Sequence, residues 1–246
     1  GGLYAAWISA LRGHQVTLLE KGEELGGNFR IASYPTGKGQ LSEAIRSLIV
    51  KCQMAGVDLR CGVEADEALL RSLTPDAVIL ATGSTPLVLP IPGLDTCGYV
   101  TAQAMLEGKA PVGCKVLVVG GGMVGCEAAE YLAERGHEVA IVEMKDEIAA
   151  DVTPENRRYM FANFEEHHVL LRPSAKVGQF YPDGVDYTLA GGAAGSLRGY
   201  DSIVLAMGSR PNAALKETAE KLAAKVFVIG EAAKAPGNAV LATGDA

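Results

Sequence analysis

The chain has 246 residues, 48% of them hydrophobic and 21% charged, which is long and apolar enough to bury a core and excludes a disordered chain. Its 22 basic and 29 acidic residues give a net charge of −7, which argues against nucleic acid or a membrane surface as a partner. The sequence contains no apolar run of transmembrane length and no visible signal peptide.

The first half of the chain opens with a predicted helix that starts at Gly2 and closes at the Arg-Gly-His turn of residues 12–14. The glycine of this turn can take the left-handed conformation that ends a helix. The next stretch, Gln15–Leu19, is rich in apolar and β-branched residues, as in a parallel strand covered on both faces. Glu20 follows it, and the glycines of the loop Glu24–Asn28 are placed to pass close to a diphosphate.

A later buried strand is predicted in each half of the chain. Residues 75–86 read PDAVILATGSTP, and residues 200–211 read YDSIVLAMGSRP. Each strand runs into a glycine, Gly83 in the first half and Gly208 in the second. A glycine at this point lets the chain leave the sheet beside a bound cofactor.

The most specific motif follows the strand predicted over Lys115–Val119, where the sequence GGGMVG opens a helix. The glycines of this G-x-G-x-x-G motif are Gly120, Gly122 and Gly125. The next predicted strand, Glu138–Val142, is followed by Glu143, 18 residues after the last glycine. A strand before the motif, a helix after it and an acidic residue at this distance are typical of a dinucleotide-binding fold.

In this motif the first glycine permits a tight turn, the second lets the backbone approach a pyrophosphate, and the third lets helix and strand touch. The diphosphate would bind the free N–H groups at the helix N-terminus. Glu143 would accept hydrogen bonds from the adenosine ribose, and its charge would repel a 2′-phosphate, so NAD(H) is favoured over NADP(H). A nucleotide fold that has lost its ligand is the alternative.

The two halves of the chain are related by an internal repeat. Residues 2–25 match residues 125–148 with an offset of 123, which predicts two sister α/β domains. The matched pairs include Gly2/Gly125, His14/His137 and Glu20/Glu143. Gly2 would then be the third glycine of a fingerprint whose strand and first two glycines are absent. We therefore expect either a piece of a longer chain or another segment in that place.

The remaining elements are predicted from local patterns. Residues 182–184 are expected to form a hairpin turn, and residues 190–199 a small, flexible segment. Residues 226–229 are predicted to form a short buried strand that returns to the first domain, followed by the sequence Gly-Glu-Ala at 230–232.

Several reactive residue types have simpler structural interpretations. His14 and His137 lie in equivalent turns, and residues 167–168, both histidine, are more typical of a helix end than of a metal site. Cys126 is expected to be a buried packing residue, although a position just inside a helix favours a reactive thiol. Residues 244–245, Gly-Asp, follow a helical pattern and are interpreted as unrelated to the site.

The five cysteines are odd in number and include no close pair, which favours a reduced, cytoplasmic setting. A zinc site, an iron–sulfur cluster or a redox-active dithiol within this chain is therefore not expected.

The order of these motifs resembles the flavoproteins with two dinucleotide-binding domains. More narrowly, five segments look like the C-terminal part of the NADH:flavin oxidoreductase / 2,4-dienoyl-CoA reductase / trimethylamine dehydrogenase family. These segments are LGGN (25–28), ATGSTPLVLPIPG (81–93), VTAQAML (100–106), GGGMVGCEAAEYLAERGHEV (120–139) and VEMKDEIAADV (142–152).

The resemblance implies an α/β fold of two Rossmann-like domains. The FAD-binding domain would comprise residues 1–109 and 213–246 and lack its first strand, and the NAD(H)-binding domain, 110–212, would be inserted in it. It also implies an N-terminal (β/α)₈ barrel, not in this sequence, that carries FMN and a [4Fe–4S] cluster. Electrons would pass from NADH through FAD and the cluster to FMN, which reduces an activated C=C bond of an enoate or dienoyl-CoA type substrate.

The chain would then be an electron-input module, inactive toward the final substrate alone, with NADH and the barrel as partners; a homo-oligomer is compatible with the family. The residues that the resemblance places beside FAD (or ADP) are Gly2, Glu20, Lys21, Gly27, Asn28, Ala65, Ala81, Thr82, Gly83, Gly230 and Glu231. Those beside NAD are Gly120, Gly122, Met123, Val124, Gly125, Glu143, Met144, Val177, Ala206, Met207 and Gly208. Glu231 stands where the family usually has an aspartate, so its contact to the flavin ribitol is kept, moved or lost.

Two other classes stay open. A pyridine nucleotide-disulfide reductase would need a close cysteine pair beside the flavin, which ranks this class low. A non-catalytic module that binds ADP or another nucleotide is favoured by the incomplete first fingerprint and opposed by the complete second one.

Overall fold

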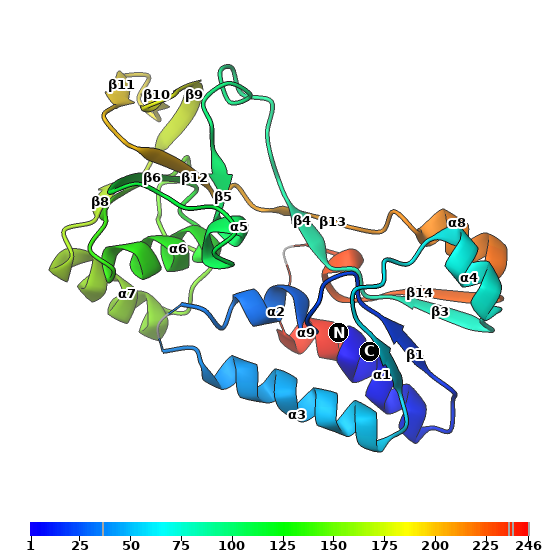
Figure 1. The fold of residues 1–246 in the computed structure, drawn as a ribbon. Helices are drawn as coiled ribbons and strands as arrows, with labels where there is room; N and C mark the ends of the chain where they lie inside the picture. Colours follow the sequence, from blue (N-terminus) through cyan, green and yellow to red (C-terminus); the bar gives the residue numbers. More distant parts are fainter. Residues whose placement is uncertain (36, 236, 238, 246) are drawn as a thin grey trace. The chain divides into compact units, whose positions relative to one another are not determined.

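The computed structural model describes residues 1–35, 37–235, 237 and 239–245. The chain divides into two compact units, and Figure 1 labels most of their helices and strands. Unit 2 runs from Pro86 to Gly208, and unit 1 consists of Gly1–Thr85 together with the segment from Ser209 onward. The predicted α/β architecture, with one unit inserted in the sequence of the other, is confirmed.

The division of the structure differs from the predicted boundaries at 109/110 and 212/213. The segment before residue 110 contains β5 (Val100–Thr101) and α5 (Ala102–Leu106), and β5 pairs in parallel with β12 (Ser202–Leu205). This pairing gives β5 and α5 to unit 2. The chain crosses between the units at β4 (Ser84–Pro86) and β13 (Ser209–Pro211), which pair with each other.

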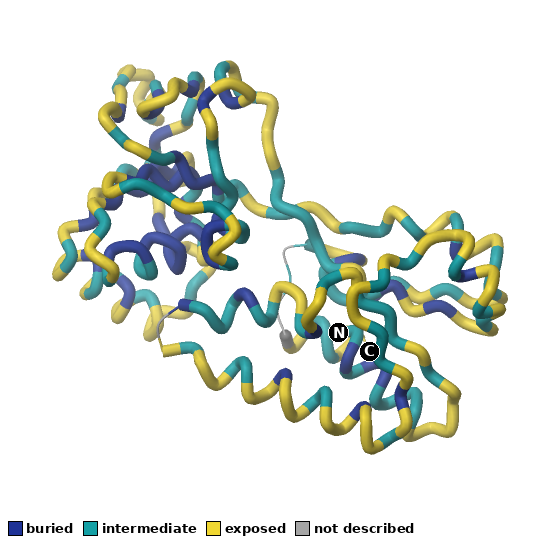
Figure 2. The backbone as a smooth tube through the Cα atoms, viewed as in Figure 1, coloured by how far each residue is buried: buried dark blue, intermediate teal, exposed yellow. Residues whose placement is uncertain are grey.

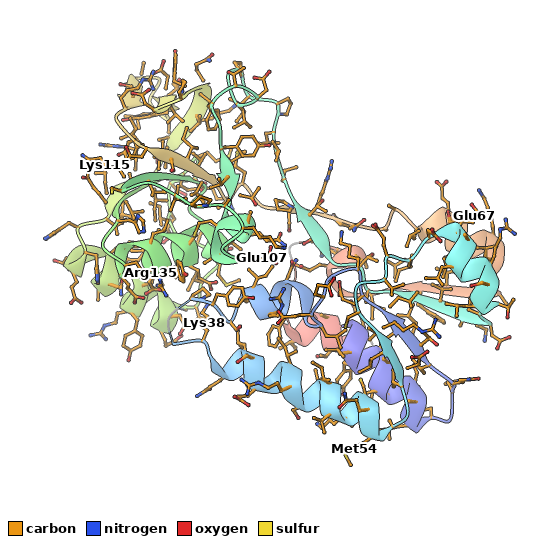
Figure 3. All side chains as sticks on the ribbon, in the orientation of Figure 1. Lys38, Met54, Glu67, Glu107, Lys115 and Arg135 are labelled. Carbon is orange, nitrogen blue, oxygen red and sulfur yellow. The ribbon has the colours of Figure 1, made fainter. Side chains whose placement is uncertain are left out.

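Unit 2 is built on a five-stranded parallel sheet of order β5-β12-β6-β7-β8. The central strand β6 (Lys115–Val119) and its neighbour β7 (Glu138–Val142) occupy the predicted residues, and β8 is Leu170–Arg172. The interior residues of β6 are completely buried, and Figure 2 shows the buried residues of unit 2 gathered in this sheet and in the adjacent helix. Lys115, labelled in Figure 3, ties the starts of β6 and β7 by an ion pair of 3.0 Å with Glu138.

Helix α6 (Met123–Ala133) packs on this sheet, and α7 (Pro154–Glu166) packs on α6. Ala128 and Ala129 have no exposed surface, as expected where small side chains bring a helix close to a sheet. The helix is followed by Gly136 with φ +85°, which confirms the predicted left-handed turn.

The histidines have the structural places predicted for them. His137 Nδ1 lies 2.8 Å from the Gly113 carbonyl oxygen, and His14 lies in the equivalent turn after α1 (Gly2–Leu11). His167 is the C-terminal cap of α7, and His168 has φ +55°. A positive φ at this point is a conformation that glycine adopts more readily than a residue with a side chain.

A three-stranded antiparallel sheet covers one face of the parallel sheet of unit 2. Its strands are β9 (Ala175–Tyr181), β10 (Gly184–Leu189) and β11 (Ala194–Leu197), and the predicted turn at 182–184 is confirmed. The expectation of a flexible segment over 190–199 is wrong, because β11 pairs with β10. Small residues are needed there: a Cβ at Gly195 would lie 2.5 Å from the Tyr187 ring.

Unit 1 contains two separate pairs of parallel strands. β1 (Thr17–Leu19) pairs with β2 (Asp58–Arg60), and β3 (Ala77–Leu80) pairs with β14 (Lys225–Val228). The predicted return of the last strand to the first domain is confirmed by its pairing with β3. The helices of unit 1 after α1 are α2 (Gly27–Ile31), α3 (Gln40–Met54), α4 (Glu67–Leu73), α8 (Lys216–Leu222), the 3₁₀ helix η1 (Gly230–Ala232) and α9 (Ala239–Gly244).

The repeat shows which strand would join the two parallel strand pairs of unit 1 into a sheet like the parallel sheet of unit 2. By the matched sequences, β1 corresponds to β7 and β3 to β12, and in unit 2 the strand between those two is β6. Among the described residues of unit 1, no strand occupies the place of β6. Helix α1 contacts both β1 and β3, so one helix holds the two pairs. No helix in the described part of the chain is both long and apolar enough to cross a membrane.

Candidate functional site

The glycine loop of unit 2 follows β6 and opens α6. Gly120 has φ +110°, and a Cβ there would lie 2.3 Å from the Ala206 carbonyl oxygen. A Cβ at Gly125 would lie 1.9 Å from the Gly120 carbonyl oxygen, closer than any side chain could be placed. Both positions therefore require glycine so that α6, β6 and the end of β12 can meet.

The acidic residue predicted beside the loop packs directly against it. Glu143 is 8% exposed, and its Oε2 accepts a hydrogen bond from the Gly121 N–H at 2.6 Å. Its Oε1 accepts one from the Lys145 N–H at 2.8 Å. The carboxylate thus joins the glycine loop to the end of β7. Each carboxylate oxygen has a second lone pair, so the group can still accept a hydrogen bond from a ligand.

A second carboxylate, not found by sequence reasoning, lies at the start of α6. The Met123 N–H donates to Asp151 Oδ1 at 2.9 Å, and a Cβ on Gly122 would lie 3.4 Å from Asp151 Oδ2. Gly122 is the N-terminal cap of α6 and has no side chain with which to cap it. The only sequence signal was an Asp inside the segment that follows Glu143, and its spacing does not reveal the contact.

Cys126 is buried on the first turn of α6, and its thiol donates to the Gly121 carbonyl oxygen at 3.3 Å. Burial, with a smaller contribution from Asp151, raises the pKa of the Cys126 thiol to about 12. The expectation of a packing residue is confirmed, because a neutral buried thiol is not a nucleophile at physiological pH.

We expect thiol reagents to modify only Cys61 and Cys114 in the native chain, since these two cysteines are exposed and the other three are buried. Burial also raises the pKa of the Cys52 and Cys97 thiols, so both are protonated at pH 7 as well as shielded from the reagent. Mass spectrometry after alkylation should count two adducts in the native chain and five in denaturant. Fast native modification of Cys126 at pH 7 would contradict the buried thiol.

Unit 1 repeats the contacts of this loop where its sequence allows. A Cβ at Gly2 would lie 3.2 Å from the Ala81 Cβ, as a Cβ at Gly125 would lie 3.1 Å from that of Ala206. Glu20 Oε1 accepts from the Gly22 N–H at 2.8 Å, which matches the contact of Glu143 with the residue two positions on. The repeat in sequence is therefore a repeat in geometry.

Three polar side chains meet in unit 1 from segments far apart in the sequence. Glu231 Oε2 accepts from Asn28 Nδ2 at 2.8 Å and from Ser84 Oγ at 3.0 Å. Its Oε1 accepts from the Gly237 N–H at 3.2 Å. Asn28 and Glu231 were predicted site residues, whereas Ser84 was missed, although it directly follows Gly83 in the motif.

The other predicted residues differ in their contacts and in their exposure to solvent. Thr82 Oγ1 donates to the Asn212 carbonyl oxygen, and the glycines that end the late strands, Gly83 and Gly208, have φ +67° and +98°. Val177 and Met207 pack against the core of unit 2. The remaining predicted residues are all at least partly exposed to solvent. They are Lys21, Gly27, Ala65, Ala81, Val124, Met144, Ala206 and Gly230, and Gly230 has φ +59°.

In unit 2, the predicted residues other than Val177 gather where the parallel strands end. Gly120 follows β6, Glu143 follows β7, and Ala206 follows β12. In open α/β sheets this edge is where ligands bind. Val177 lies in β9, part of the antiparallel sheet, and its side chain faces the core.

The family model described as pyridine nucleotide-disulphide oxidoreductase matches residues 1–246. The chain is 40% identical over 236 residues to an NADH oxidase of Thermoanaerobacter brockii and 36% identical over 230 residues to a bilirubin reductase of Mediterraneibacter gnavus. Each alignment covers 94% of this chain and 36% of the relative.

A solved structure of a 2-naphthoyl-CoA reductase in complex with 2-naphthoyl-CoA is also similar. It superposes with a TM-score of 0.91 at 28% identity and covers 98% of this chain and 36% of that one. The chain therefore spans about a third of the length of each of these three relatives.

Proposed function

The chain belongs to the pyridine nucleotide-disulphide oxidoreductase family, and on that premise we propose that unit 1 binds FAD and unit 2 binds NADH. The observation that carries the proposal is the repeated site. In each unit a glycine packs against the end of a late strand, and a glutamate follows β1 in unit 1 and β7 in unit 2. Members of this family are oxidoreductases that bind FAD and NAD(P)H. Two such sites in one chain suit hydride transfer between two dinucleotides.

In unit 2, the residues fit an NADH site. The N–H groups of Met123 and Val124 lie in the first turn of α6 and have no acceptor within the helix, so they suit a diphosphate. Glu143, already fixed by two backbone donors, would accept the ribose hydroxyls. Its negative charge supports NADH over NADPH, since a 2′-phosphate would meet a buried carboxylate.

In unit 1, the residues fit FAD in part. Glu20 would bind the adenosine ribose, and Gly83 would let the chain turn away beside the flavin. Glu231 would reach the ribitol with its remaining lone pair on Oε1, because Asn28 and Ser84 already occupy Oε2. When bound, FAD supplies an acceptor for hydride and can pass electrons on singly. The chain's part would be to bind and orient one cofactor in each unit.

We further propose that the chain serves a larger enzyme as its electron-input module. The three relatives described above are about three times as long, and two of them are a bilirubin reductase and a 2-naphthoyl-CoA reductase. A barrel with FMN and a [4Fe–4S] cluster would reduce an unsaturated substrate of the enoate or dienoyl-CoA type. Disulfide chemistry is not proposed, since the five cysteines of the sequence include no close pair.

One observation favours a non-catalytic nucleotide-binding module as a second candidate. The sheet of unit 1 is divided into two strand pairs, and the place of β6 is empty among its described residues.

The test is an absorbance spectrum of the chain loaded with FAD, recorded before and after anaerobic NADH. We expect bound flavin absorbance that bleaches with NADH and bleaches far less with the same concentration of NADPH. Flavin that stays oxidised while NADH binds would favour the non-catalytic module. A chain that binds neither FAD nor NADH would contradict the proposal altogether.

A further inference from the structure

The place proposed for the NADH diphosphate already holds a carboxylate of the chain itself. Asp151 Oδ1 accepts the hydrogen bond of the Met123 N–H at 2.9 Å, and Oδ2 lies beside the Cα of Gly122 on the side where a Cβ would stand. These are the second glycine of the motif and the first residue of α6, the two places where the backbone would meet a pyrophosphate. A carboxylate there mimics the charge and the hydrogen bonding of a phosphate oxygen.

Asp151 lies at this position because the turn before it is held by buried residues and backbone hydrogen bonds. Ile148 and Ala149 are 3% and 0% exposed, and the Ala149 N–H donates to the Gly121 carbonyl oxygen at 2.7 Å. Ala149 has φ +57°, unusual for a residue with a side chain, and its carbonyl accepts from the Val152 N–H at 3.1 Å. Asp151 itself is exposed. The backbone of the turn is therefore fixed, whereas the carboxylate can swing into solvent by rotation of its own side chain.

We propose that Asp151 is an internal stand-in for the dinucleotide diphosphate and weakens NADH binding until its side chain swings away. This inference rests on the proposed NADH site in unit 2. A diphosphate and a carboxylate cannot both accept from the Met123 N–H, and their like charges repel at this distance. The carboxylate keeps the first turn of α6 capped in the absence of nucleotide, and NADH binds in competition with it.

The test compares NADH affinity of the chain with that of Asp151→Asn. The asparagine oxygen can still accept from the Met123 N–H, so the cap is kept while the charge is removed. We expect Asp151→Asn to bind NADH about fivefold more tightly, the effect of ~1 kcal/mol between two unit charges about 4 Å apart in water. The advantage should shrink between low and about 0.5 M salt, because salt screens exposed charges.

Glu155→Gln is the matched control, since Glu155 is exposed in the first turn of α7 and its replacement changes the net charge equally. Its NADH affinity should equal that of the unmodified chain. Asp151→Ser, a second uncharged variant with a capping oxygen, keeps the test open if Asp151→Asn unfolds.

The outcomes separate this inference from the proposed function. Equal or weaker NADH binding by the folded Asp151 variants, with binding retained by the unmodified chain, overturns the role of Asp151 alone. It would mean that the carboxylate only builds the loop. No NADH binding by any of the folded proteins overturns the NADH site and this inference together.

Discussion

Gly125→Ala should unfold unit 2 or destabilise it by about 4 kcal/mol or more, the range reached by severe steric substitutions. A Cβ at this position would lie 1.9 Å from the Gly120 carbonyl oxygen. The obstacle is backbone, and it belongs to the loop that joins the central strand to α6. To remove the clash, α6 would have to move away from the sheet. This movement would expose Ala128 and Ala129, which are completely buried. Thermal or urea unfolding followed by circular dichroism measures the loss.

Gly178→Ala is the control for this prediction. Gly178 lies in β9 of the same unit, its φ is not in the left-handed region, and a Cβ there meets no atom within 4 Å. Alanine should change the stability by less than about 1 kcal/mol, as is usual for substitutions without a steric clash. Equal stability of the two variants would show that α6 does not approach the loop as closely as described.

Glu143→Ala should lower the stability of unit 2 by about 3 kcal/mol and weaken NADH binding more than tenfold. The carboxylate accepts from the N–H groups of Gly121 and Lys145, and its loss leaves donors without partners at a site that is 8% exposed. Hydrogen bonds to a charged group contribute about 1.5–3 kcal/mol each. Isothermal titration with NADH below the unfolding temperature separates the loss of binding from the loss of folded protein.

Glu20→Ala is the matched variant in unit 1. Glu20 is the repeat partner of Glu143 but is only partly buried, and its carboxylate accepts from the Gly22 N–H. We expect a stability loss of about 1 kcal/mol, unchanged NADH affinity and weaker FAD binding. Unchanged NADH affinity in folded Glu143→Ala would refute the ribose assignment of Glu143.

Local patterns were sufficient for much of this fold. β6 and β7 were predicted to the residue, because continuous β-branched runs bounded by turn signals are typical of buried parallel strands. The Arg-Gly-His turns and the hairpin at 182–184 were also predicted from local sequence. Gly13, Gly136 and Gly184 have positive φ, a conformation that glycine adopts readily. The internal repeat then linked the two units without any structure.

Contacts between distant segments could not be predicted in this way. β11 is a strand only because β10 lies beside it, and three of its four residues, Ala-Gly-Ser, are small and not typical of strands. Asp151 reaches Met123 through a turn set by the buried Ala149, and Ser84 reaches Glu231 across 147 residues. These residues are not spaced with the period of a helix or a strand, so their contacts follow only from the path of the folded backbone.

The pairing of β3 with β14 also sets an order of events during synthesis. About 145 residues, including all of unit 2, separate the end of β3 from the start of β14. At a translation rate of about 5–20 residues per second, β3 waits roughly 7–30 s for this partner. Unit 2 is continuous in sequence and can fold during that interval. The growing chain thus completes its second unit before its first, and β3 is the edge that chaperones would need to shield meanwhile.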